Sequence, residues 1–358
     1  MLQFGFVPSK CDPSLFVYSS STALVYMLIY VDDIILTGSD SAFIQQVVTK
    51  LNSVFSLKEL GDLEYFLGIE VKPQSNGCLL LSQGKYIRDL LSKTNMLDSK
   101  PLSTPMFAGC KLTKAGSDTF SDPTLYRSVV GALPYATITR PDICFSVNKV
   151  CQFMSHPLEA HWQAVKRIMR YLKGTISLGL ILHPVPQLPI KLQAFCDADW
   201  GFDPDDRCST SGACVFLGSN LISWWAKKQP VISRSSTEAE YRSLALATSE
   251  LLWIQSLLTE LGVTFTRPLV HCDNMSTISL THNPVLHACT KHMELDLFFV
   301  REKVLNKQLQ VVHVPGHLQC ADVLTKALPP SKFEDFRTKL TVDNPQMSLR
   351  GANRDSIE

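Results

Sequence analysis

Hydrophobic and polar positions alternate with a short period in the first part of the chain, where β-branched and aromatic residues gather in brief runs. This pattern predicts strands, and it is interrupted twice by the wider spacing of apolar residues that predicts a helix. The predicted strands are 14–18, 23–31, 34–37, 65–71 and 78–82, and the predicted helices are 41–55 and 84–96. Turn-like residues at 19–22 and 73–77 separate the strands of each pair. This part of the chain is therefore expected to be α+β.

The pattern changes twice further along the chain. Residues 101–122 are rich in Pro, Ser, Thr, Gly and Lys with little periodicity, which favours a linker, and helical spacing dominates 126–173. After the proline-rich 184–189 the pattern becomes that of a mixed α/β unit. Its predicted strands are 192–196, 213–217, 221–225, 269–272 and 309–314, and its predicted helices are 237–261, 274–281, 290–306 and 320–327. Residues beyond about 340 are polar and aperiodic, which predicts a flexible tail.

Composition adds bounds to this picture. With 358 residues, 45% of them hydrophobic, the chain can form two or three modest domains, and a net charge of +1 says nothing about nucleic acid. Eleven cysteines without a C-x-x-C pair suggest neither a zinc ribbon nor a disulfide framework. The longest apolar run, 23–30, is too short for a membrane span, and the N-terminus lacks the basic flank of a signal peptide. We therefore expect a soluble intracellular protein in a reducing compartment, cytoplasmic or nuclear, with no membrane partner.

Four acidic residues of the α/β unit fall at strand ends and helix starts. Asp197 and Asp273 each follow a predicted strand, while Glu240 and Asp322 begin predicted helices. Strand ends converge at one edge of such a sheet, and converging carboxylates are what two magnesium ions require at a phosphodiester. The alternative role for Glu240 is part of a capping box. The alternative role for Asp273 and Asp322 is that of a helix N-cap.

Two further groups of charged residues are candidates for contact with nucleic acid. Asp32 and Asp33 follow Tyr30-Val31 between apolar strands, at the tip of a hairpin, where the alternative is ordinary turn chemistry. The spacing of the other group puts several of its members on one helical face, where the alternative is a solvated surface. It consists of Lys166, Arg167, Arg170 and Lys173.

Six ordered blocks of the C-terminal unit resemble the ribonuclease H of copia-type retrotransposons. They are FCDADWG (195–201), RCSTSGACVFL (207–217), SSTEAEYRSLA (235–245), HCDN (271–274), KHMELDLFFVRE (291–302) and VPGHLQCADVLTKAL (314–328). The resemblance implies a ribonuclease H-like domain with a mixed five-stranded sheet and flanking helices. It also implies catalytic acids at Asp197, Glu240, Asp273 and Asp322 that hold two Mg²⁺ ions, for which Mn²⁺ is a substitute, with His317 assisting. Asp199 shares a strand face with the first acid and is the main ambiguity.

The N-terminal part resembles the reverse transcriptase of the same polyprotein. The segments YVDD (30–33), IILTG (34–38), FLGIEV (66–71), LLLSQGKYI (79–87), RSVVGALPYATITRPDI (127–143) and HWQAVKRIMRYLKGT (161–175) carry the resemblance. It implies a catalytic hairpin at Asp32 and Asp33, with Asp32 a metal ligand. In the family another metal-binding aspartate lies on an earlier palm strand, and this sequence begins after it, so we expect no autonomous DNA synthesis.

Together these observations predict a fragment of a retrotransposon polyprotein. The expected organisation is a truncated reverse transcriptase palm and start of the thumb (1–105), a helical thumb or connection region (106–189), a ribonuclease H-like domain (190–335) and a flexible tail (336–358). The expected activity is magnesium-dependent cleavage of the RNA strand of an RNA·DNA hybrid, held mainly through phosphates and 2′ hydroxyls. The alternative is a catalytically inert relic that binds nucleic acid, associates with itself or associates with other Pol segments.

Overall fold

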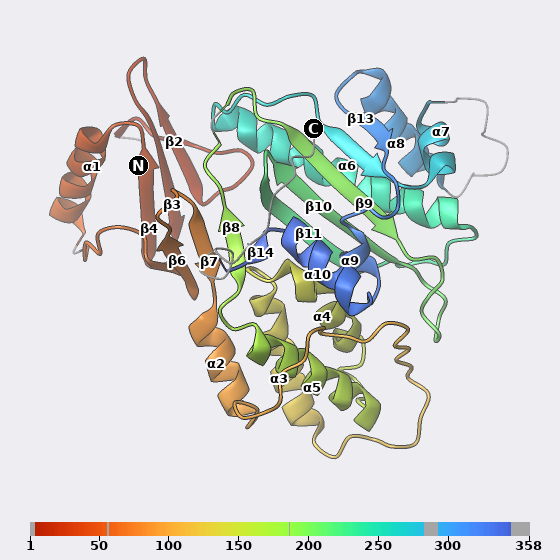
Figure 1. Cartoon of the computed structure of the whole chain (residues 1–358). Coiled ribbons are helices and arrows are strands. Elements are labelled where there is room, and N and C mark those ends of the chain that lie inside the picture. The colour runs from red at the N-terminus through yellow and green to blue at the C-terminus, as the bar shows by residue number, and fades with distance from the viewer. Residues whose placement is uncertain (1–3, 56, 186, 283–292, 345–358) are drawn as a thin grey trace.

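The N-terminal part of the chain forms a small antiparallel sheet covered by one helix (Figure 1). The structure is a computed structural model that describes residues 4–55, 57–185, 187–282 and 293–344. The sheet consists of β1 (Val7–Pro8), β2 (Leu15–Ser19), β3 (Leu24–Tyr30) and β4 (Asp33–Gly38), and α1 (Ser41–Val54) packs on it. The predicted hairpin and helix are thus confirmed. Asp40 caps α1, since its side chain accepts a hydrogen bond from the Phe43 amide.

A second sheet joins segments from both ends of the chain. Its order is β14-β8-β7-β6-β5, so that residues near 80, 180 and 342 lie side by side. The strands are β5 (Tyr65–Phe66), β6 (Ile69–Pro73), β7 (Leu79–Ser82), β8 (Gly179–Leu182) and β14 (Val342–Asp343). The single strand predicted over 65–71 is wrong. A turn at Leu67-Gly68, where both residues have positive φ (45° and 75°), folds it into a hairpin. Glycine is required here because a Cβ at position 68 would lie 2.5 Å from the Tyr135 hydroxyl.

Helices occupy the middle of the chain, as predicted. They are α2 (Gly84–Lys93), α3 (Pro123–Ala136), the 3₁₀ helix η2 (Pro141–Ile143), α4 (Cys144–Cys151) and α5 (Glu159–Gly174). The expected linker 101–122 contains no helix or longer strand, but it is not free of the fold. Met106, Cys110 and Phe120 are buried against the helices, so this segment is part of the core.

The C-terminal unit is built on the mixed five-stranded sheet that the sequence predicts. The strand order is β11-β10-β9-β12-β13, in which β9, β10 and β11 are antiparallel while β9, β12 and β13 are parallel. The strands are β9 (Leu192–Ala198), β10 (Thr210–Leu217), β11 (Asn220–Lys228), β12 (Leu269–Cys272) and β13 (Gln310–His313). The helices are α6 (Ser236–Glu260), α7 (Met275–His282), α8 (Glu294–Leu305) and α9 (Asp322–Thr325). Part of the predicted helix 290–306 lies outside the described residues.

This sheet lies between two hydrophobic cores. Ala213 and Val215 of β10 face α6 and α8, while Cys214 and Phe216 face the helices of the middle region. The alternation follows from the period of two in a strand, and both sets are apolar because both faces are covered. The ribonuclease H-like part and the helical part therefore share a core.

The chain ends in ordered structure beyond the expected start of the tail. Helix α10 (Pro330–Lys339) crosses position 336, and Phe336, Leu340 and Val342 are almost fully buried. The flexible tail predicted from residue 336 is therefore wrong for residues 336–344. Apolar side chains at helical spacing in 333–340 were the missed signal. Residues 345–358 lie outside the described residues.

The N-terminal sheet contacts the far end of α6. The amide of Lys10 donates to Glu260 Oε1 (3.1 Å), the Tyr26 hydroxyl donates to the Leu261 carbonyl (2.5 Å), and Trp253 Nε1 donates to the Cys11 carbonyl (3.3 Å). In the part of the chain that the structure describes, no helix combines the length and the apolar character needed to cross a membrane.

Candidate metal centre

The four acids singled out in the sequence come from four elements that meet at one edge of the mixed sheet. Asp197 lies near the end of β9, and Asp273 directly follows β12, the parallel neighbour of β9. Glu240 projects from α6, and Asp322 is the first residue of α9. The parallel pairing brings the two strand ends together, as the sequence predicts.

A glycine permits the close approach of α9. Gly212 of β10 pairs with Asp197, and a Cβ at position 212 would lie 2.7 Å from Leu324 Cβ. The missing side chain lets α9 lie against β9 and β10. Asp322 is consequently placed beside Asp197.

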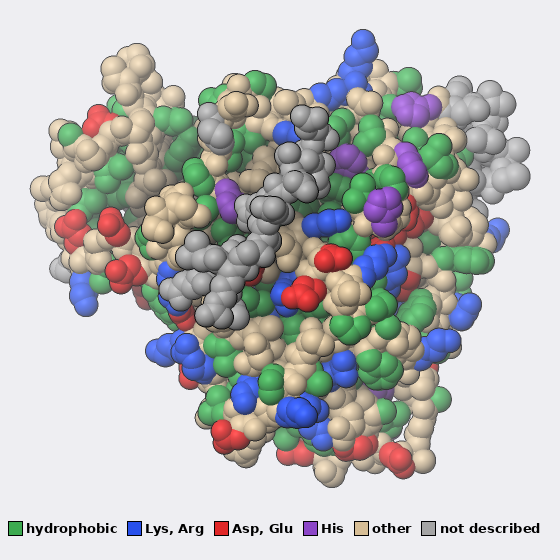
Figure 2. Space-filling model, in the orientation of Figure 1, with side chains coloured by type: hydrophobic (Ala, Val, Ile, Leu, Met, Phe, Trp, Pro, Cys, Tyr) green, Lys and Arg blue, Asp and Glu red, His purple; other side chains and the backbone are tan. Residues whose placement is uncertain are grey.

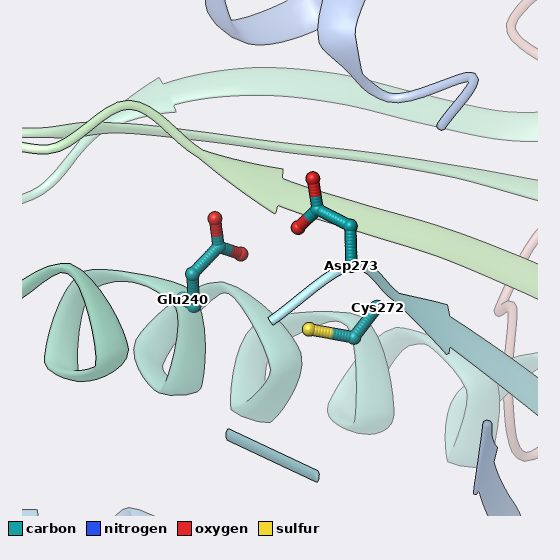
Figure 3. A group of neighbouring side chains, drawn as sticks. All are labelled: Glu240, Cys272 and Asp273. Atoms are coloured by element: carbon teal, nitrogen blue, oxygen red, sulfur yellow. The ribbon is translucent and has the colours of Figure 1, made fainter. Parts of the chain in front are cut away.

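Carboxylate oxygens of Asp197, Asp273 and Asp322 all lie within 4.8 Å of one another, and so do single ligand atoms of Glu240, Cys272 and Asp273. Figure 3 shows Glu240 rising from α6 toward the end of β12, with the Asp273 carboxylate and the Cys272 sulfur turned to the same space. Asp273 belongs to both groups. The two groups therefore form one continuous cluster.

The capping alternatives do not hold in the structure. Ser235 is the N-cap of α6, accepting from the Glu238 amide (3.2 Å), and Glu238 accepts from the Arg234 amide (2.8 Å). Glu238 rather than Glu240 is thus the acid at the helix start. At α7 the Asn274 side chain accepts from the Thr277 amide (3.0 Å), which leaves Asp273 out of the cap. Asp322 lies inside α9, whose N-cap position is Ala321.

Burial and mutual repulsion act on the cluster. Asp197 and Glu240 are 2% and 6% exposed. Burial, followed by the nearby Asp197 carboxylate, raises the pKa of Glu240 to about 11. The same two causes raise the pKa of Asp273, and burial raises that of Asp197. Without a cation, this cluster favours protons on its buried carboxylates.

Two lysines that the sequence analysis missed supply positive charge at the cluster. Lys326 Nζ lies 2.7 Å from Asp322 Oδ1 and 3.5 Å from Asp197 Oδ2, and Lys332 Nζ lies 2.7 Å from Asp322 Oδ2. Burial alone would lower the pKa of Lys326, but Asp197 and Asp322 raise it. The Thr325 hydroxyl also donates to Asp197. The i, i+4 spacing of Asp322 and Lys326 was a signal for the first lysine, whereas Lys332 reaches the site only through the packing of α10.

Asp199 has a different environment from Asp197. It accepts a hydrogen bond from the Thr210 amide (2.5 Å), across the start of β10, and burial raises its pKa to about 7. It belongs to neither group of close ligand atoms among the described residues. The geometry favours Asp197 as the member of the cluster.

His317 is exposed in the loop between β13 and α9. The preceding Gly316 lies against the cluster, since a Cβ there would be 3.7 Å from Asp273 Oδ2. The loop therefore borders the site. The structure shows no hydrogen bond from His317 to any of the described acids.

The basic residues of α5 have partners within the chain. Arg167 donates to the Thr104 hydroxyl (2.7 Å), Arg170 to the Lys100 carbonyl (2.6 Å) and Lys173 to the Ser99 carbonyl (2.9 Å). Lys166 lies 3.9 Å from Glu159. On the face drawn in Figure 2, Lys and Arg side chains over the helical region are interspersed with acidic and hydrophobic ones. Three of these four basic side chains fasten the 99–104 segment to α5.

Asp32 and Asp33 lie exposed at the tip of the β3–β4 hairpin, as predicted. Tyr30 pairs with Asp33, and Val31 between them has φ of 51° with its side chain 83% exposed. A β-branched residue in the left-handed region is a strained conformation that marks functional turns. Among the described residues, neither group of close ligand atoms includes these aspartates.

The acids of the ribonuclease H-like part fit magnesium. They offer oxygen ligands from four elements, and Glu240 Oε2 is buried without a hydrogen-bond partner. A bound cation would satisfy that oxygen and remove the repulsion among the carboxylates. The residues present therefore suit a divalent cation with a preference for oxygen.

Comparisons with known proteins agree with this architecture. Residues 1–108 match the family described as Reverse transcriptase (RNA-dependent DNA polymerase). The chain is 48% identical over 343 residues to the Retrovirus-related Pol polyprotein from transposon RE1 of Arabidopsis thaliana, covering 96% of this chain and 23% of that protein. It is 32% identical to the Putative transposon Ty5-1 protein YCL074W of Saccharomyces cerevisiae, covering 67% of this chain and 78% of that protein. The chain thus spans just under a quarter of the RE1 polyprotein.

Among solved structures, a ribonuclease H1 isolated from compost (LC11-RNase H1) is 16% identical, with 38% of this chain and 92% of that chain covered and a TM-score of 0.29. A TM-score this low does not define a fold. The assignment of the C-terminal unit rests on its own strand order and pairing.

Proposed function

The chain belongs to the Pol polyproteins of copia-type retrotransposons, as a reverse transcriptase segment followed by a ribonuclease H-like domain, and we propose that it cuts the RNA strand of RNA·DNA hybrids with magnesium. The observation that carries the proposal is the convergence of Asp197, Glu240, Asp273 and Asp322 from four separate elements. Repulsion among these carboxylates destabilises the fold when no metal is bound. A nuclease uses the same carboxylates to hold the metal ions that act on the phosphodiester.

Each acid has a role that follows from its position. Asp197 and Asp273, at adjacent strand ends, and Asp322 are close enough to share cations, and Glu240 closes the cluster from the α6 side. When bound, two magnesium ions would activate the attacking water and stabilise the leaving 3′ oxygen. Mn²⁺, which accepts the same oxygen ligands, is a substitute.

The surrounding residues position these groups. The Ser243 hydroxyl donates to the Asp197 carbonyl (2.8 Å), tying α6 to the end of β9. Thr325 holds the Asp197 carboxylate from the α9 side. We assign proton transfer or product release to His317, which follows Gly316 on the exposed loop that borders Asp273.

A substrate panel tests this function. The purified chain should cut the RNA strand of a hybrid with magnesium, and should leave a DNA duplex of the same sequence intact because that duplex lacks 2′ hydroxyls. Glu240→Gln should abolish cutting, since it removes a metal ligand and keeps the side-chain shape. A folded parent chain that cuts no hybrid with magnesium or manganese would refute the proposal.

A second candidate function is association, either between copies of this chain or with other Pol segments. It is favoured by the large exposed hydrophobic side chains at and after the C-terminal end of α1, among them Val54 (70% exposed), Leu60 (73%) and Tyr65 (56%). Light scattering should then show a concentration-dependent increase in mass that Leu60→Lys reduces. A monomer at all concentrations would exclude self-association.

A further inference from the structure

One sulfur atom lies within the acidic cluster. Cys272 ends β12, is fully buried, and places Sγ within 4.8 Å of ligand oxygens of both Glu240 and Asp273 (Figure 3). Successive side chains in a strand point to opposite faces, but Asp273 lies just beyond the end of β12. The chain bends at that residue, so both side chains can face Glu240.

The oxygen opposite this sulfur is available to a ligand. Glu240 is only 6% exposed, and its Oε2 has no hydrogen-bond partner. Its carboxylate points into the space that Cys272 and Asp273 border (Figure 3). An unpaired buried carboxylate oxygen is costly, and a cation at this point would remove that cost.

We propose that Glu240, Cys272 and Asp273 form a site for a thiophilic divalent cation, Zn²⁺ or Cd²⁺, and that this ion inhibits the nuclease by taking two ligands of the magnesium site. The ligand set argues for this class of ion. Magnesium has little affinity for sulfur, whereas zinc binds thiolate together with carboxylate, commonly with three protein ligands and one open position. Among Glu240, Cys272 and Asp273, the sulfur atom of Cys272 is therefore what favours a soft cation over magnesium.

Binding of the cation displaces one proton from the site. The Cys272 thiol gives its proton to the buffer as the sulfur–metal bond forms, and no oxidation or reduction occurs. The ion then holds Glu240 and Asp273, which the proposed reaction needs for magnesium. Inhibition should accordingly be relieved by a chelator and not by added substrate.

A second buried cysteine provides a matched control. Cys214 lies on β10, is also fully buried, and faces the helices of the middle region, on the side of the sheet away from α6. It belongs to neither group of close ligand atoms among the described residues. Cys214→Ala and Cys272→Ala thus remove the same group from two strands of one sheet, and only the second should remove a metal ligand.

The direct test is a cadmium titration of the full chain under a phosphine reductant, following the ultraviolet charge-transfer band of cadmium–thiolate bonds. The parent and Cys214→Ala should show a tight binding phase that Cys272→Ala lacks. Asp273→Asn, which keeps the thiol, should weaken that phase by about tenfold or more. An equal tight phase in Cys272→Ala and the parent would overturn the proposal, as would its absence from a folded parent.

The inhibitory part rests on the proposed nuclease function and is tested separately. With each variant normalised to its own zinc-free rate, the zinc concentration for half inhibition should rise at least about tenfold in Cys272→Ala and stay unchanged in Cys214→Ala. If the chain cuts no hybrid, the cadmium titration still decides whether the site exists. If it cuts hybrids but zinc inhibits both variants equally, the inhibitory site is refuted and the nuclease is not.

Discussion

Single residues at the acidic cluster show how the fold tolerates so many carboxylates without a metal. Lys326 and Lys332 both contact Asp322, and Lys326 also faces Asp197. These ammonium groups stand where cations would otherwise be needed. They therefore compete with a metal for the same carboxylate oxygens.

Removing one of these lysines should tighten magnesium binding. Lys326 is 41% exposed, so its ion pairs are screened and contribute no more than about 1 kcal/mol. Lys326→Met should lower the magnesium concentration that gives half of the maximal increase in melting temperature by about two- to fivefold. The control is Lys339→Met, whose ammonium lies over the Phe336 ring and not at the cluster. An unchanged or weaker magnesium response in Lys326→Met would contradict the competition.

At the scale of the residue, the sequence predicted that the four acids converge, as the structure shows, but it did not identify Lys326 and Lys332 beside them. The catalytic roles of the acids stay a prediction. Strand ends and helix starts are visible in the hydrophobic pattern, so Asp197, Glu240, Asp273 and Asp322 could be placed together. The choice between Glu240 as part of a capping box and as a cluster member depended on whether Ser235 or Thr237 is the N-cap of α6. That boundary is fixed by the Ser235 cap, which pattern alone does not determine.

Among the elements, α5 illustrates the limit of arguments from charge. Three of its four basic residues donate to the 99–104 segment, two of these to backbone carbonyls. A backbone carbonyl needs a donor when it is covered, and the sequence does not reveal which distant donor supplies it. The role of these residues in binding nucleic acid stays a prediction.

One substitution separates the two roles of α5. If Arg170 mainly fastens the chain at Lys100, Arg170→Gln should lower the free energy of unfolding by about 1–2 kcal/mol and leave the affinity for an RNA·DNA hybrid unchanged. Urea unfolding and hybrid binding over a range of salt measure both. The nucleic-acid role would instead be supported by a weaker affinity together with a smaller slope of log affinity against log salt concentration, by about the amount expected for one phosphate contact.

Helices and strands were largely predictable where the periodic pattern of apolar residues extends over many positions. Helix α6 was expected over 237–261 and spans Ser236–Glu260, and the mixed sheet has the predicted strands. The failures involve positions set by tertiary contacts. The turn at Leu67-Gly68 lies close to Tyr135, and β14 pairs with β8, and neither contact is visible in the hydrophobic pattern.

At the scale of the molecule, the predicted helical region and the predicted ribonuclease H-like domain share a core. Helix α10 contributes Phe333 and Phe336 to the same core as α3, α4 and α5, and β14 pairs with β8 in the second sheet. Figure 1 shows α10 between the helical region and the mixed sheet. We propose that the helical region and the ribonuclease H-like part fold as one cooperative unit.

A pair of shortened chains tests this unit. A chain ending at residue 335 loses Phe336, Leu340 and Val342, and loss of one large buried side chain alone costs about 3–5 kcal/mol. It should therefore melt far below a chain ending at residue 344, which keeps α10 and β14 whole. Calorimetry should show a single transition for the longer chain. Equal melting temperatures for the two chains would refute the shared core.

The most direct test of the central claim is the initial rate of RNA cleavage in a labelled RNA·DNA hybrid at millimolar magnesium, compared among four folded proteins. Asp197→Asn and Glu240→Gln should each lower the rate by more than about a hundredfold, because each removes a proposed metal ligand. Asp32→Asn should cut at nearly the rate of the parent, since Asp32 lies at the tip of a hairpin in a different sheet. Parental rates in the first two variants, or a loss in Asp32→Asn as large as theirs, would contradict a nuclease site at the convergence of β9, α6, β12 and α9.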